Sequence, residues 1–138
     1  VIHVESKKYR VDPYRVVAIM YQESGIVTHA LNKKYDKRVI KECDDNLDCV
    51  TTIVETSTVT DYGLFQFHRR TMEIHDLDVH TVMNNWRFTV RFAIQMIADK
   101  IRMCKRLWPT TAWACYNSAT PGKHEEYVED VNRWYLRK

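Results

Sequence analysis

The chain has 138 residues, a formal net charge of +3 and 45% hydrophobic residues, with only 3 Gly and 3 Pro. This composition excludes disordered, collagen-like and low-complexity classes. A chain of this length fits one domain, which we expect over residues 1–138 with one core and one cleft. No apolar run approaches the roughly 18 residues that span a bilayer, so no membrane span is expected.

Charge is interleaved along the chain. Residues 1–38 carry 8 basic and 4 acidic side chains, residues 39–61 carry 1 and 6, and residues 62–138 carry 12 and 8. The acidic block would repel phosphates, so no nucleic-acid partner is expected. The pattern indicates a positively charged body with one acidic flap, for which a polyanionic cell surface is a better partner than DNA.

The first clear element is a helix that begins near residue 13. Asp12 followed by Pro13 is typical of a helix N-cap and first helical position. An apolar run from Val16 to Met20 follows, and Gly25 marks the end. Glu23 therefore falls at the helix C-terminus, where a negative charge is unfavourable against the helix dipole.

From Arg38 to Asp61 the helical period is lost. Residues 39–40, 50–54 and 56–60 are rich in β-branched side chains, and the polar segment 43–48 separates them. Such runs around a polar turn predict a hairpin or a small antiparallel sheet.

Helical periodicity returns in the second half. Apolar residues at steps of three and four predict a long buried helix; they are Val90, Ile94, Ile97, Ile101, Cys104 and Trp108. Pro109 then begins a shorter helix through Asn117, and Tyr127, Val131 and Trp134 mark a final helix. The predicted fold class is α+β, mostly helical with one antiparallel β flap.

Four cysteines leave two interpretations open. The spacings between Cys43 and Cys49 and between Cys104 and Cys115 lack the paired CxxC of a zinc site, so no metal is implied. Two disulfides or four free thiols remain possible. If the protein is exported, we expect a disulfide between each of these two pairs.

Three segments together resemble the lysozyme-like superfamily, specifically the lytic transglycosylase (SLT) domain of the secretion-system and phage-associated kind. They contain Glu23-Ser24, then Gly63-Leu64-Phe65-Gln66, then Ala114-Cys115-Tyr116-Asn117. The stretch Tyr127-Val128-Glu129-Asp130-Val131 is also similar to the family's C-terminal part. The resemblance implies a lysozyme-like fold with the β flap next to the active-site cleft, and no cofactor.

The resemblance also assigns roles to single residues. Glu23 would be the general acid and then the base, because a carboxyl group in an apolar or crowded site is protonated near neutral pH. Gln66 and Tyr116 would line the cleft and hydrogen-bond the sugar N-acetyl groups or the catalytic Glu. Ser24 and Asn117 would hold the local geometry.

Two departures from the family pattern leave alternatives open. Glu23 and Gly63 are 40 residues apart, more than is usual in the family, so an enlarged acidic flap is expected over about residues 34–61. Such an insert either reshapes substrate access or caps the cleft against another protein. The segment Thr60-Asp61-Tyr62-Gly63 resembles the one that carries the second catalytic carboxylate in chicken-type lysozymes, which makes Asp61 a catalytic candidate.

The favoured function is a peptidoglycan lytic transglycosylase that forms a 1,6-anhydro product. A hydrolytic lysozyme that uses Asp61 is the first alternative, and a non-catalytic glycan-binding or assembly module is the second. The expected partners are peptidoglycan glycan strands and a component of a secretion apparatus or virion. We expect an exported monomer in the periplasm or cell wall, or one delivered there by a phage particle.

Overall fold

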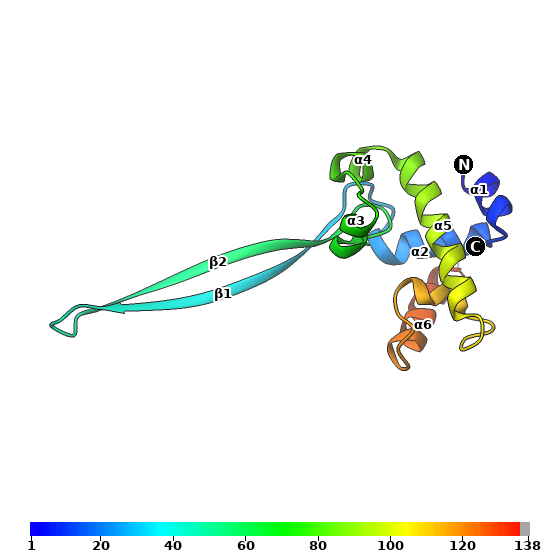
Figure 1. Ribbon diagram of the computed structural model, residues 1–138. Coiled ribbons are helices and arrows are strands. Elements are labelled where there is room, and N and C mark those ends of the chain that lie inside the picture. The colour runs from blue at the N-terminus through cyan, green and yellow to red at the C-terminus, as the bar shows by residue number, and fades with distance from the viewer. Residues whose placement is uncertain (136–138) are drawn as a thin grey trace.

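The computed structural model describes residues 1–135 (Figure 1), so residues 136–138 of the expected domain lie outside the described part. The elements in chain order are α1 (Ile2–Tyr9), α2 (Pro13–Ser24), β1 (Leu31–Cys43), β2 (Cys49–Tyr62), β3 (Phe67–His68), α3 (Arg69–Ile74), α4 (Val79–Asn84), α5 (Trp86–Cys104), the 3₁₀ helix η1 (Ala112–Tyr116) and α6 (Lys123–Tyr135). The strands form one antiparallel sheet in the order β1-β2-β3. The predicted α+β class, mostly helical with a small antiparallel sheet, is confirmed.

Helix α2 has the ends that its sequence predicts. The Asp12 side chain accepts a hydrogen bond of 2.9 Å from the Tyr14 backbone N–H and caps the first turn. At the other end Gly25 adopts a left-handed conformation, with φ 63°, that stops the helix. Ile19 is fully buried, and Glu23 follows one turn later, where the helix leaves the core.

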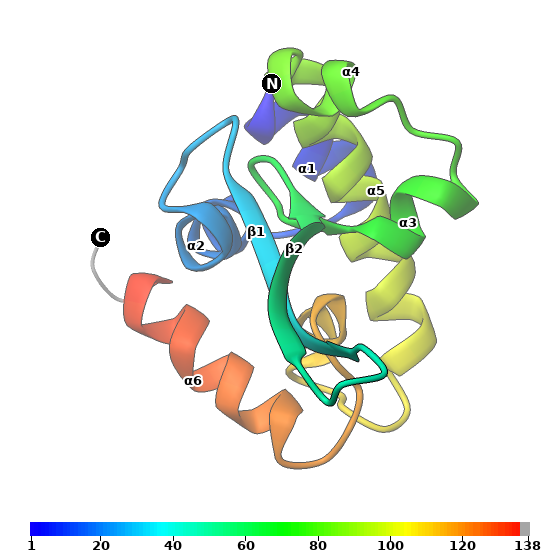
Figure 2. The ribbon, with the colours of Figure 1, turned by 90° about the vertical axis from the view of Figure 1, so that its left-hand side faces the viewer.

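The β1–β2 hairpin extends far from the helical body, as Figure 1 shows. Its strands pair from Cys43 with Cys49 at the tip to Leu31 with Tyr62 at the base, so it begins earlier than the predicted flap. Residues 34–61 carry seven acidic and four basic side chains, so this segment is net acidic as expected, but its charges are not evenly distributed. β1 carries five Lys or Arg side chains, whereas three Asp gather in the tip loop 44–48. Figure 2 looks along the hairpin, with α2 and α6 on one side and α3 and α5 on the other.

Helix α5 is the central helix of the body. Val90, Ile94 and Ile97 are fully buried, as their spacing predicts. The prediction is wrong at the C-terminal end, because α5 ends at Cys104 and Trp108 lies beyond it. Pro109 is followed by turns, and the predicted short helix is a 3₁₀ helix that covers only residues 112–116. No helix in the described part of the chain is long and apolar enough to cross a membrane.

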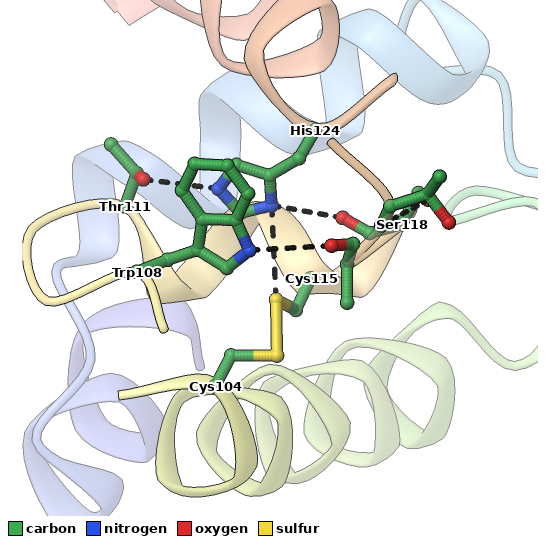
Figure 3. Close-up of a disulfide and its surroundings, with 8 residues drawn as sticks. Cys104, Trp108, Thr111, Cys115, Ser118 and His124 are labelled. Carbon is green, nitrogen blue, oxygen red and sulfur yellow. Dashed lines mark hydrogen bonds between the residues drawn. A yellow bond between two sulfur atoms is a disulfide. The ribbon is translucent and has the colours of Figure 1, made fainter. Parts of the chain in front are cut away.

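Both expected disulfides are present, Cys43–Cys49 at the hairpin tip and Cys104–Cys115 in the body. Figure 3 shows the second one beside the fully buried His124 of α6. The His124 ring stacks on Trp108 at 3.9 Å, its Nδ1 donates to the Ser118 carbonyl at 2.9 Å, and its Nε2 lies 3.0 Å from the Thr111 hydroxyl. This cluster ties α5, η1 and α6 together.

Candidate active site

A cleft of about 700 Å³ lies between the hairpin base and the helical body. All the site residues predicted from the sequence line it, namely Glu23, Ser24, Asp61, Gln66, Tyr116 and Asn117. They come from α2, β2, the turn before β3 and the end of η1, so the fold gathers segments that lie far apart in the chain. From the hairpin strands, only Leu31, Asn32 and Asp61 line the cleft.

Glu23 is the titratable group with the strongest case for acid chemistry. Its position at the end of α2 leaves the carboxyl group at the cleft but mostly shielded from water. The pKa of Glu23 is raised to about 7: burial is the main cause, a hydrogen bond from Tyr127 lowers the pKa in part, and the nearby negative charge of Asp61 adds to the rise. A carboxyl group with this pKa is partly protonated at neutral pH and can donate a proton there.

Tyr127 of α6 contacts Glu23 directly and was not among the residues predicted for the site. Its hydroxyl donates to Glu23 Oε1 at 2.6 Å. Burial first, and then the charge of Glu23, raise the pKa of Tyr127 well above its usual value, so this hydroxyl keeps its proton. The sequence holds a signal for it, because a Tyr on the buried stripe of a helix needs a partner for its hydroxyl.

Asp61 reaches the cleft through an irregularity in the hairpin. Asn32 pairs with Asp61 and Lys33 pairs with Val59, so Thr60 is an extra residue in β2 and forms a β-bulge. Bulges next to active sites redirect side chains. The Thr60 hydroxyl at 2.9 Å and the Asn32 amide at 3.2 Å both donate to Asp61 Oδ2, which fixes this carboxylate.

The turn between β2 and β3 holds Gln66 and is bonded to Ser24. Gln66 Nε2 donates to the carbonyls of Ala30 at 3.1 Å and Gly63 at 2.8 Å, so the amide nitrogen stabilises the turn rather than contacting Glu23. The Ser24 hydroxyl donates to the Leu64 carbonyl at 2.8 Å. Ser24 thus links the end of α2 to the turn and sets the position of its neighbour Glu23.

Tyr116 and Asn117 close the cleft from the end of η1. The Tyr116 hydroxyl donates to the Phe65 carbonyl at 2.7 Å. Burial, followed by the charges of Glu23 and Asp61, raises the pKa of Tyr116 well above its usual value, so it stays neutral. Asn117 follows at the end of η1 and lines the cleft beside it.

A second, smaller hollow of about 280 Å³ adjoins the cleft at Glu23 and Asn117. Glu23 and Asn117 line both hollows, and Lys123, Tyr127 and Asp130 of α6 line only the second. Glu23 therefore borders both depressions. A chain-like substrate can occupy both while one of its bonds lies at Glu23.

The fold and this cleft define a lysozyme-like protein with a protonatable Glu at its centre. The family model "Transglycosylase SLT domain" matches residues 1–133, so the chain belongs to the SLT transglycosylase family. At the family level this supports a lytic-transglycosylase type of action on peptidoglycan. Searches of curated proteins and of solved structures give no significant match.

Proposed function

We propose that the protein is a peptidoglycan lytic transglycosylase that cleaves the β-1,4 bond between N-acetylmuramic acid and N-acetylglucosamine. The observation that carries this proposal is the Glu23 carboxyl group with a pKa of about 7 in the cleft. Family membership supplies the substrate class. The two hollows that share Glu23 support binding of a glycan strand that continues past the cleaved bond.

In the first step, protonated Glu23 donates its proton to the glycosidic oxygen as the bond to the muramic acid C1 breaks. The departing N-acetylglucosamine then leaves with a free hydroxyl group. Tyr127 binds Oε1 of Glu23 and so orients the carboxyl group. The negative charge of Asp61, held by Thr60 and Asn32, stabilises the positive charge that develops on the sugar ring.

In the second step, the 6-hydroxyl of the same muramic acid attacks C1. Glu23, now a carboxylate, accepts the hydroxyl proton, and the product is a 1,6-anhydro sugar. The proton that Glu23 gave in the first step thus returns to it in the second. No water molecule and no enzyme nucleophile are consumed.

Asp61 favours a second candidate, a hydrolytic retaining muramidase. It lines the cleft with Glu23, and its charge is close enough to raise the pKa of Glu23. Retaining glycosidases place a second carboxylate about 5 to 5.5 Å from the acid, where it captures the sugar. In that reaction water completes the cleavage, and the products have reducing ends.

The other alternative, a non-catalytic glycan-binding or assembly module whose flap blocks turnover, is supported by no feature of the described residues. Beyond Leu31 and Asn32, the residues of β1 do not line the cleft, and the hairpin points away from the body (Figure 1). A turbidity assay on purified cell walls separates the classes, because a binding module does not clear them.

Mass spectrometry of the released muropeptides separates the two enzyme reactions. We expect anhydro ends from the unmodified protein, and an Asp61→Asn variant that is slower but still forms them. Reducing ends from the unmodified protein would instead establish hydrolysis. Glu23→Gln should lose activity by 10² to 10⁴, the usual range for loss of acid catalysis. Glu129→Gln, an exposed change on α6, is its matched control.

We place the protein outside the cytoplasm, in the periplasm or cell wall, with a secretion apparatus or virion as its wider setting. Its substrate lies there, and the two disulfides support an oxidising compartment. Thiol titration of the denatured, unreduced protein tests this placement. Four free thiols would contradict it.

A further inference from the structure

The β1–β2 hairpin has a long edge with no partner strand. β3 pairs with β2 only at Asp61 and Tyr62, so within the described chain the β2 edge from Cys49 to Thr60 is free. A strand of 13 residues spans about 40 Å, and Figure 1 shows no helix along the hairpin beyond its base. Two-stranded ribbons are marginally stable in water, and further strands stabilise them. The free edge is therefore a site for a further strand.

The two edges of the hairpin differ in charge. β1 carries seven charged side chains, five of them basic (Lys33, Lys34, Lys37, Arg38 and Lys41) and two acidic (Asp36 and Glu42). Residues 49–60 of β2 carry one charge, Glu55, and 9 of these 12 residues are Val, Ile or Thr, with no Pro or Gly. Charged side chains on an edge strand prevent edge-to-edge pairing, whereas an uncharged β-branched edge promotes it. The β2 edge is thus the one suited to pairing.

The backbone groups that point outward follow from the register. The Cα atoms of Cys43 and Cys49 are 4.0 Å apart, which is the close spacing of a non-hydrogen-bonded antiparallel pair. Such pairs alternate with hydrogen-bonded pairs, so every second residue of β2 directs its backbone groups away from β1. Starting from Cys49, these residues include Ile53, Glu55 and Ser57, whose backbone N–H and C=O groups point away from β1. An antiparallel strand laid along β2 would find a row of free donors and acceptors there.

The charges at the two ends of the β2 edge indicate which kind of strand can pair with it. The tip loop is acidic, with Asp45 and Asp48 exposed. At the other end, where β3 leads into α3, Arg69 and Arg70 are exposed, and Arg70 makes no ion pair with any described residue. An antiparallel strand that begins with an acidic loop would place that loop beside these arginines. β2 with its own tip loop is such a strand.

We propose that the protein forms a two-fold dimer in which the free β2 edges of two copies pair antiparallel, and the acidic tip of each copy contacts Arg69 and Arg70 of the other. An axis at Val54, near the centre of the edge, sets Ile53 opposite Glu55 of the other copy and keeps the two Glu55 carboxylates from facing each other. The two bodies then lie at opposite ends of a four-stranded sheet. The dimer departs from the monomer expected from the sequence, and it does not depend on the proposed enzymatic reaction.

Sedimentation equilibrium of the full chain tests the dimer. A single pair of strands is at the small end of specific interfaces, so we expect a Kd between about 1 μM and 1 mM that rises with salt. Ile53→Pro removes an outward N–H, and an edge strand tolerates Pro at such a position. Its control is Val39→Pro, directly across the hairpin on β1 and similarly exposed, 64% against 54% for Ile53.

We expect Ile53→Pro to raise the Kd at least tenfold and Val39→Pro to leave it unchanged. Circular dichroism and thiol titration show whether each variant keeps its hairpin and disulfides. A chain that stays monomeric to about 1 mM overturns the proposal and leaves the edge to a strand of another protein. An equal loss in the two proline variants also overturns it, because the β2 edge would then not be the contact.

A charge exchange tests the contact between tip and body without touching the strands. Arg70→Glu should weaken the dimer, and adding Asp48→Lys in the same chain should restore it, since the two groups would meet with reversed signs. Arg106→Glu, an exposed change after the end of α5, is the control for net charge. If Arg70→Glu weakens association no more than this control does, the proposed arrangement of the two copies is wrong.

Discussion

Replacement of Glu23 by Gln should stabilise the fold at alkaline pH and have little effect at acidic pH. Burial raises the pKa of Glu23 from its ordinary 4.5 to about 7, so the folded protein binds the proton more tightly than the unfolded chain does. This contribution to stability is fully present below pH 4.5. It is lost as the pH rises through 7, where the charged carboxylate becomes a cost to the fold.

The magnitude follows from the shift in pKa. Each pKa unit corresponds to 1.36 kcal/mol, so a rise from 4.5 to about 7 corresponds to about 3 kcal/mol. Gln has the shape of protonated Glu and can still accept the hydrogen bond from Tyr127. The free energy of unfolding of Glu23→Gln, relative to the unmodified protein, should therefore increase by about 3 kcal/mol between pH 4 and pH 8.

Urea unfolding followed by tryptophan fluorescence at several pH values measures this difference. Taking the difference between variant and parent cancels the titration of the other groups. Glu129→Gln makes the same chemical change at an exposed position, and we expect no comparable trend from it. A difference for Glu23→Gln that stays flat from pH 4 to pH 8, or falls, would refute the conclusion that burial raises the pKa of Glu23 to about 7.

Three further predictions concern the residues around the cleft. Tyr127→Phe removes a hydrogen bond that favours the charged form of Glu23, so the alkaline limb of the pH–activity profile should move up by about one unit, measured with cell-wall substrate. Gly63→Ala should cost about 1 to 3 kcal/mol in urea unfolding, because φ is +77° and a Cβ would lie 3.1 Å from Val82 Cγ1. Gly25→Ala, at φ +63° in open space, should cost less, and equal costs would exclude crowding at Gly63. Replacing Cys104 and Cys115 by Ser should lower stability by about 3 kcal/mol and also reduce activity, whereas the same change at Cys43 and Cys49 should spare activity.

Elements with strong local signals could be predicted from the sequence. Helix α2 has Asp12 as its cap and Gly25 as its stop, and the buried stripe of α5 repeats at helical spacing. The short helices α1, α3 and α4 have 6 to 8 residues and few buried side chains, so no clear periodicity indicates them. Trp108 continues the helical spacing of the buried α5 residues but lies outside the helix. There its indole N–H donates to the Ala119 carbonyl and its ring packs on His124.

The candidate site could be predicted in its members but not in its geometry. Short motifs indicated Glu23, Asp61 and Gln66, and the structure brings all of them to one cleft. Motifs do not show that the Gln66 amide nitrogen is bound to two backbone carbonyls. The contact of Tyr127 with Glu23 joins residues 104 positions apart, and only the packing of α6 on α2 creates it.

The long hairpin coexists with an intact cleft because only its base contributes to the cleft. The hairpin base is fixed to the body, because Gly63 N–H donates to the Ala30 carbonyl at 2.7 Å and β3 pairs with Asp61 and Tyr62. The β-bulge at Thr60 lies next to this base. From the pair Lys33–Val59 to the tip, β1 and β2 therefore pair in a register shifted by one residue from the register at the base. Residues between Lys33 and Val59 can therefore lengthen, change charge or bind a partner without moving Asp61. This separation frees the hairpin for a role distinct from that of the cleft.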